Sequence, residues 1–283
     1  MKLLKLFLLV LAFSVKPSFS QETIAPANPP SNNKLSYALD ATYRLDGQSW
    51  FNEHNVQYTH KFDDSFKISA QADFYTHYQY DPVKNHWSLY VKERYVRLKF
   101  VESPFINLLG FNTGWEVRYH LPVDETQEQQ GTFGMVSPRL NMTRVFSDHF
   151  NLTLIPKMYI DMNRRGYQKY GTNQANELGG IGIEALPQWV FTPVLTLTYD
   201  PELIALAMGA TPKQEHVTYQ FYYDHELELM YTFKHFHNIG LGALWKMDYF
   251  FFGNGHISVN SNNEAFKGIR NRVGLRLIKT FDL

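Results

Sequence analysis

The sequence predicts an all-β chain that folds as a closed antiparallel up-and-down barrel of about twelve strands and crosses a membrane. From about residue 34 to the C-terminus, polar and apolar side chains alternate along segments long enough for tilted transmembrane strands. Short connections alternate with long ones, and most short connections have a phenylalanine on each side. A soluble sandwich has no reason to mark one end of its hairpins with Phe, whereas a transmembrane barrel places aromatic rings at the membrane interface.

The segment 35–45 sets the phase, with leucine, tyrosine and alanine on one face and Asp40 and Arg44 on the other. A helix would spread the charges of such runs around its whole surface. The same period of two recurs in the segments 66–74, 150–161, 216–234, 239–249 and 273–283. The other strands are predicted at 50–62, 87–101, 106–121, 132–146, 177–191 and 193–207. An even number of strands places both termini on the periplasmic side.

Two predicted strands interrupt the pattern. In the fourth, the phase slips between Val91 and Val96, which indicates a β-bulge near Glu93. In the ninth, Asp200-Pro201 breaks the alternation, and proline cannot donate to a central ladder. The stretch 178–208 therefore holds either one hairpin or a strand with an ordered loop, and ten or fourteen strands remain as alternatives.

The connections predict the orientation of the barrel, because periplasmic turns are short and outer loops are long. The long connections span 46–50, 81–86, 122–131, 163–176, 209–215 and 253–266. The predicted short turns are Asp63-Asp64-Ser65, Glu102-Ser103-Pro104, Ser147-Asp148-His149, Thr192-Pro193 and the residues around His235 to Asn238.

The N-terminus has the pattern of a signal peptide. Lys2 and Lys5 precede an apolar run from Leu6 to Val15, and Ser18-Phe19-Ser20 provides the small residues of a cleavage site. The expected organisation is a signal peptide at 1–20, cleaved between Ser20 and Gln21, a disordered periplasmic leader at 21–33, and the barrel at 34–283. No other apolar stretch approaches the ~20 residues of a spanning helix.

The amino-acid composition limits which partners and which chemistry the protein can have. Zero cysteines exclude a disulfide framework and thiol chemistry. Removing the three lysines of the signal leaves 27 − 3 = 24 basic residues against 27 acidic ones, so net charge gives no argument for nucleic acid as a partner. An aromatic content of 16% is typical of a barrel whose lipid-facing half alone is apolar.

With these features the chain resembles the bacterial outer-membrane β-barrels, including porins, without a close match to one family. The ending Phe281-Asp282-Leu283 departs from the final aromatic residue common in such barrels, although Phe281 keeps the lipid-facing phase. The resemblance implies the outer membrane as location, lipid and lipopolysaccharide as surroundings, and the barrel-assembly machinery as a partner during biogenesis. Oligogalacturonate-type porins line their walls with arginine and are similar in architecture only, since Asp73, Glu116 and Glu226 depart from such a wall.

The predicted lumen carries both signs of charge. Arg270, Arg272 and Arg276 share the inner face of the last strand, and closure places that strand beside Asp40 and Arg44 of the first. Its other neighbour carries Lys246 and Asp248, and the strand after that one carries Glu226 and Glu228. One interpretation is a basic track opposite an acidic one, which orients a charged solute. The other is that the charges pair across strands and hold the wall together.

The polar lumen favours a narrow, weakly selective channel for small hydrophilic solutes, without a cofactor. The alternative is a structural or adhesive barrel with a blocked lumen that acts through its outer loops. The loop with the most suitable side chains for lipopolysaccharide phosphates or a partner contains Arg164, Arg165, Tyr167, Lys169 and Tyr170.

A hydrolase is the third interpretation. His256-Ile257-Ser258, followed by Asn260, resembles the His-x-Ser pair and Asn of the outer-membrane phospholipase, with Ser258 as nucleophile and His256 as base. Here the pair lies among Gly, Asn and Ser residues that more often form turns, so no catalytic residue is expected. No metal site is expected either. The residues whose types and spacing come closest to those of metal ligands are His235, His237, Asp124, Glu125 and Glu128.

Overall fold

A computed structural model of the chain describes residues 32–45, 49–81, 86–123, 131–163, 177–210, 216–234, 239–253 and 270–283. The predicted signal peptide and nearly all of the predicted leader lie outside these ranges. The strands in the described residues are β1 (Asn33–Arg44), β2 (Ser49–Lys61), β3 (Phe66–Asp81), β4 (His86–Leu108), β5 (Phe111–Leu121), β6 (Thr132–Ser147), β7 (Phe150–Asn163), β8 (Glu177–Thr192), β9 (Leu195–Met208), β10 (Thr218–Phe233), β11 (Ile239–Gly253) and β12 (Arg270–Asp282).

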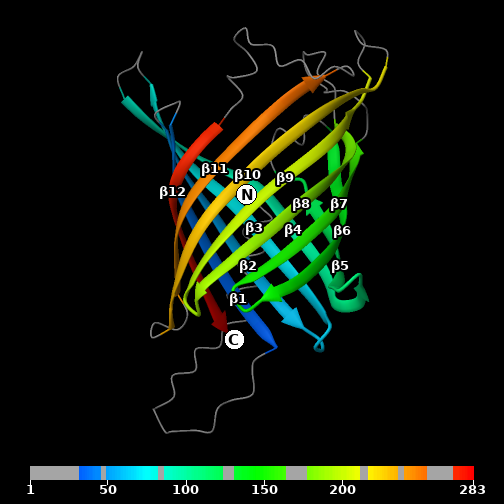
Figure 1. Ribbon diagram of the computed structural model, residues 1–283. Helices are drawn as coiled ribbons and strands as arrows, with labels where there is room; N and C mark the ends of the chain where they lie inside the picture. The colour runs from blue at the N-terminus through cyan, green and yellow to red at the C-terminus, as the bar shows by residue number, and fades with distance from the viewer. Residues whose placement is uncertain are drawn as a thin grey trace.

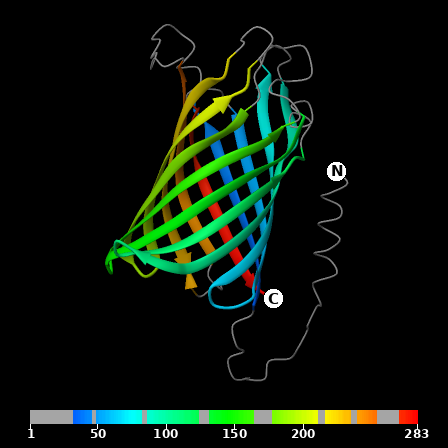
Figure 2. The ribbon, with the colours of Figure 1, turned by 90° about the vertical axis from the view of Figure 1, so that its right-hand side faces the viewer.

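The twelve strands form one closed antiparallel barrel in chain order, and β12 pairs with β1 to complete the ring. Figure 1 and Figure 2 show the strands tilted around a common axis, with the C-terminus at the same end as the short turns. The predicted barrel of twelve strands is therefore confirmed, and the alternatives of ten and fourteen are wrong. No helix in the described part of the chain is long and apolar enough to cross a membrane.

The alternation of side chains places polar groups inside and apolar groups outside. Thr42 and Ser137 are completely buried on the inner face, whereas Leu275 is 57% exposed and Ile181 is 62% exposed on the outer face. Because successive side chains of a strand point to opposite faces, one period of two residues produces both surfaces. The outer surface is thus an apolar belt, as a lipid-facing wall requires.

The short turns carry the predicted aromatic pairs. The rings of Phe62 and Phe66 lie 5.6 Å apart, those of Phe146 and Phe150 lie 5.7 Å apart, and Trp189 extends the second pair at 5.5 Å. Asp63 closes its turn by accepting hydrogen bonds of 2.8 Å from the backbone N–H groups of Ser65 and Phe66. These bonds stabilise the carboxylate and lower the pKa of Asp63.

One predicted turn is wrong. Glu102-Ser103-Pro104 lies within β4, which continues to Leu108, and the residues 106–108 assigned to the fifth strand belong to the fourth. The chain reverses instead at Leu109-Gly110, whose φ angles of 53° and 80° fit a two-residue type I′ hairpin. The β4–β5 register shifts between Glu102 and Ile106, so Pro104 is accommodated at an irregularity, where no ladder N–H is needed.

The two interruptions of the pattern have different outcomes. On β4, Tyr95 is the partner of Asp73 and Glu93 that of Phe74, so Arg94 is the extra residue of a bulge, as predicted. On β9 the strand runs through Pro201, which lies opposite His225, so the stretch holds one hairpin.

The seam between β1 and β12 depends on Gly274. A β-carbon at this position would lie 2.1 Å from the carbonyl oxygen of Ala41, far inside van der Waals contact. Only glycine lets the last strand approach the first this closely. The seam then sets Asp40 directly opposite Arg276.

Candidate functional site

Charged side chains line the lumen in four alternating sectors. In the middle of the lumen, strands β1–β3 and β8–β10 contribute acids, and β4–β7 and β11–β12 contribute mainly bases, whereas the lysines and the arginine of β1–β3 lie near the strand ends. Within a sector, like charges face each other across the ladder, for example Asp40 and Glu53, or Glu184 and Glu202. Because such pairs repel, the attractive contacts form where sectors meet. The residues that define the sectors, in the order β1–β3, β4–β7, β8–β10 and β11–β12, are Asp40, Glu53 and Asp73; Arg97, Lys99, Arg118, Arg139 and Lys157; Glu184, Asp200, Glu202, Glu226 and Glu228; and Lys246, Arg272 and Arg276.

The first junction is built around Arg276. Its Nε and Nη2 donate to the two carboxylate oxygens of Asp40, each at 2.6 Å. Its Nη1 donates to Glu226 at 2.6 Å and also to Glu228. Asp40 is only 6% exposed, so this fork replaces the water that the carboxylate has lost.

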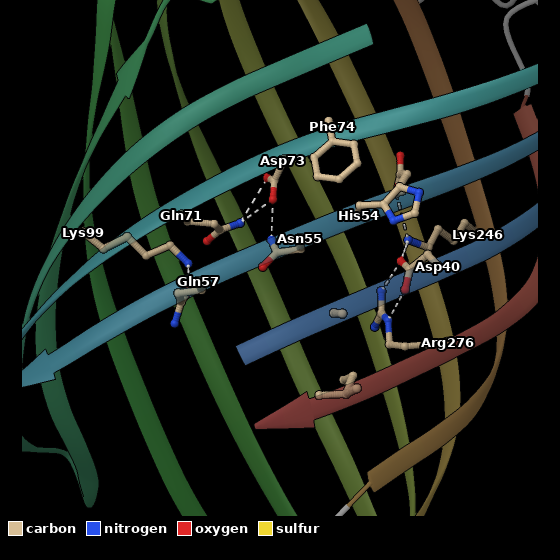
Figure 3. A pocket seen from close by; sticks show the side chains of 13 residues that line it. Asp40, His54, Asn55, Gln57, Gln71, Asp73, Phe74, Lys99, Lys246 and Arg276 are labelled. Atoms are coloured by element: carbon tan, nitrogen blue, oxygen red, sulfur yellow. Dashed lines mark hydrogen bonds and ion pairs between the residues drawn. The ribbon is translucent and has the colours of Figure 1, made fainter. Parts of the chain in front are cut away.

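Lys246 completes the same junction. Its Nζ lies 2.6 Å from Asp40, 3.0 Å from Glu226 and 3.5 Å from Glu53. Arg272 contacts Glu53 at 3.4 Å. Figure 3 shows Lys246 and Arg276 on either side of Asp40. The junction therefore joins four strands, β10 to β1, and reaches β2 through Glu53.

The second junction lies across the barrel, at β6 to β9. The Nζ of Lys157 binds Glu184 and lies 2.6 Å from Glu202, while Arg139 contacts Glu184 at 3.6 Å. The hydroxyl of Tyr159 donates to Glu202 at 2.9 Å. Lys157 is 4% exposed. Ion-paired side chains therefore fill this side of the lumen at the level of the junction.

Two cavities follow the opposite wall, along β1–β4. A cavity of about 440 Å³ at the short-turn mouth is lined by Ser36, Gln57 and Lys67, among others. A second cavity of about 360 Å³ lies deeper and is lined by Gln57, Gln71 and Lys99 together with the first junction. Because Gln57 lines both cavities, they adjoin along this wall. Solvent-accessible space thus lies on this wall both at the mouth and beside the ion pairs in the middle of the barrel.

The structure brings together six of the predicted lumen residues: Asp40, Glu226, Glu228, Lys246, Arg272 and Arg276. Arg44 is the register partner of Arg272, nearer the long connections. Asp248 and Arg270 are register partners of each other, and their side chains are outside the described part. The predicted loop residues 164–176 and the His256/Ser258 pair also lie outside the described residues.

Sequence reasoning missed Arg97, Lys99, Asp200 and Glu202. The bulge on β4 reverses the phase, so counting from its first half places Arg97 and Lys99 on the wrong face. On β9 the alternation of Thr196 and Thr198 with leucine continues into Asp200 and Glu202, and Pro201 obscured that signal. In the described ranges, no group of three or more His, Asp or Glu side chains is arranged to hold a metal ion.

A closed antiparallel barrel with an apolar belt and a charged lumen has the architecture of the outer-membrane β-barrels. Two solved structures share this fold. The COG4313 outer membrane channel from Pseudomonas putida F1 aligns with 92% of this chain and 100% of its own, with a TM-score of 0.58 and 11% identity. The NanC porin aligns with 87% of this chain and 100% of its own, with a TM-score of 0.54 and 8% identity. No protein-family model and no curated protein matches the chain.

Proposed function

We propose that the protein is an outer-membrane barrel forming a narrow, weakly selective channel for small hydrophilic solutes. The observation that carries the proposal is the pair of adjoining cavities, which places polar, accessible space at the short-turn mouth and in the middle of the lumen. The two similar structures are described as an outer membrane channel and a porin, which supports the same role. No covalent chemistry and no cofactor is part of this proposal.

The apolar belt supports the location. The exposed side chains of Phe146, Phe191 and Phe233 lie at the short-turn end, where a periplasmic interface would be. Lipid, lipopolysaccharide and the barrel-assembly machinery are the partners that follow from this location, and cleavage near Ser20 is the processing that it requires.

A plugged structural barrel is the second candidate, favoured by the burial of the junctions. Arg97, Lys157 and Lys246 are each at most 9% exposed, so charged side chains obstruct the centre. In that case the protein would act through its outer loops, with Arg164, Arg165, Tyr167, Lys169 and Tyr170 as the contact residues.

Planar-bilayer recording distinguishes the two. Purified protein that shows heat-modifiable migration on gels is inserted into a bilayer in KCl. Discrete conductance steps are expected for the channel, and silence over many insertions would establish the plugged barrel. Lys157→Gln removes the central cation of the second junction and is expected to raise the conductance of a constricted channel. The mouth variant Lys67→Gln serves as its control.

A further inference from the structure

We infer that the deeper cavity is a binding site for a small monoanion that also carries hydroxyl groups, that is, a hydroxy acid. The inference rests on the proposed channel for its route of entry, and it assigns the solute class that the channel retains. Three features of the cavity carry it: a lysine without an ion-pair contact, a set of amide acceptors, and acids that already have cationic partners.

Lys99 differs from the other cations in the middle of the lumen. Arg97 contacts Asp73 at 3.7 Å, Arg118 contacts Glu116, and the bases of the two junctions each contact at least one acid. In the part of the chain that the structure describes, Lys99 forms no ion pair. Its Nζ donates to the neutral Oε1 of Gln57 at 2.8 Å. A half-buried ammonium that lacks an ion-pair contact is costly, and a ligand carboxylate would offset that cost.

Gln71 supplies an acceptor in the same cavity. The side chain is 3% exposed, and its Nε2 donates to both carboxylate oxygens of Asp73, at 2.9 and 3.0 Å. Because a carboxylate only accepts, these bonds fix which end of the amide faces Asp73. The Oε1 is left buried, with no hydrogen-bond partner among the described residues. A buried acceptor without a donor costs free energy, which a ligand hydroxyl would recover.

Gln57 provides a second acceptor once Lys99 turns to a ligand. Figure 3 shows Lys99 reaching Gln57, with Gln71, Asn55 and Asp73 joined beside them on the same wall. Asn55 donates to Asp73, so the carboxylate of Asp73 is already occupied by the two amides and Arg97. The wall therefore presents one ammonium donor and two amide acceptors to the cavity.

Among the charged side chains that line the cavity, Lys99 differs in having no ion-pair contact among the described residues. Asp40 and Glu53 are paired with Lys246, Arg272 and Arg276, and Asp73 is paired with Arg97. One negative charge on the ligand balances Lys99, whereas a second would face these three carboxylates. A neutral polyol would leave Lys99 uncompensated, and an anion without hydroxyls would leave the amides unused. A hydroxy acid with one carboxylate meets both requirements.

The test uses glycerate, with glycerol and propionate as matched probes that lack the charge and the hydroxyls respectively. In bilayers, glycerate is expected to reduce the single-channel current in a saturable manner, glycerol to have no such effect, and propionate to act only at higher concentration. Lys99→Gln is expected to raise the half-blocking glycerate concentration about tenfold, a factor that corresponds to ~1.4 kcal/mol. Lys67→Gln removes the same charge on β3 at the mouth, and is expected to leave the half-blocking concentration unchanged.

Calorimetric titration of glycerate into the detergent-solubilised barrel separates this inference from the proposed function. Binding without conductance steps would overturn the channel and keep the site. Conductance steps with the same half-blocking glycerate concentration in the wild type and in Lys99→Gln would overturn the site and keep the channel. A block by glycerol as strong as the block by glycerate would have the same meaning. Should Lys99→Gln not fold, as judged by heat-modifiable migration, Gln71→Met is the second variant. It is expected to weaken glycerate binding while leaving propionate binding unchanged, and equal glycerate affinity would overturn the site.

Discussion

The guanidinium group of Arg276 binds three acids from two different strands, Asp40 on β1 and Glu226 and Glu228 on β10. Asp40 has a second cation in Lys246, whereas Glu228 has only Arg276 among the ion pairs of the described residues. Removing Arg276 therefore leaves Glu228 as a largely buried carboxylate without its counter-charge. Such a change lowers the free energy of unfolding far more than the removal of an ion pair at the surface does.

We predict that Arg276→Gln destabilises the folded barrel by about 3–5 kcal/mol, as expected for breaking a buried ion pair. Urea unfolding in detergent, followed by tryptophan fluorescence, measures the loss. Lys34→Gln is the matched control at the same seam, because Lys34 and Asp282 form an exposed pair whose side chains are 52% and 67% accessible. Its cost is expected to stay below ~1 kcal/mol. Equal effects of the two substitutions would contradict the structural role of Arg276.

Residue-level prediction succeeded where the phase of a strand was uninterrupted. The alternation of β12 places Arg272 and Arg276 on the lumen face, and ring closure in chain order makes Asp40 their neighbour. The contacts of Arg276 with Glu226 and of Lys246 with Asp40 skip a strand, and no pattern in the sequence specifies them. They depend on side-chain length and on the curvature of the closed wall.

At the scale of single elements, the β4–β5 hairpin shows the limit of sequence signals. Phe100 and Phe105 flank Glu102-Ser103-Pro104 as other phenylalanines flank true turns, yet the strand continues for several residues. The signal that decides is Leu109-Gly110, where both residues have positive φ. Leucine is unusual in that conformation, so the turn residues carried no strong pattern. The other three short turns among the described residues, at 62–65, 148–149 and 193–194, were predictable because Asp, Ser and Pro favour them.

We predict opposite effects for two substitutions in this hairpin. Gly110→Val places a β-branched residue at φ 80° and is expected to destabilise the barrel by about 1–2 kcal/mol, the cost of the left-handed region for an L-residue. Leu109→Asn creates the Asn-Gly pair that type I′ turns prefer, and is expected to stabilise the barrel by a few tenths to ~1 kcal/mol. The urea midpoint of each variant, at an unchanged m-value, is the measurement. A destabilised Leu109→Asn variant would show that the turn is held by other contacts.

At the scale of the whole molecule, the alternating sectors bring cations and carboxylates close together across the lumen. The field along a conducting path is therefore set by small imbalances between signs rather than by one uniformly charged wall. Substitution of the arginines of β12 tests whether such imbalances set the ion preference. Arg276 and Arg272 have acidic partners, and the side chain of Arg270 lies outside the described part.

We predict that replacing Arg270, Arg272 and Arg276 together by Gln shifts the reversal potential in a salt gradient towards cation preference. Three positive charges are lost while Glu53, Glu226 and Glu228 remain, and the shift is expected to grow at low ionic strength, where screening is weak. A reversal potential that the triple substitution leaves unchanged would mean that these arginines hold the wall together and do not filter ions. Heat-modifiable migration confirms that the variant is folded before it is recorded.

The seam between β1 and β12 has a consequence for how the barrel comes into being. The two cations that bind Asp40 lie 206 and 236 residues further along the chain, on the last two strands. During synthesis the first strand is therefore complete long before its neighbour on one side exists, and its edge and its carboxylate await β11 and β12. Contacts of such sequence separation form slowly, and an open β edge invites pairing with other chains. The arrival of β12 removes the edge and brings Arg276 to Asp40 in one event, so the interval before it is when the chain is most exposed to aggregation.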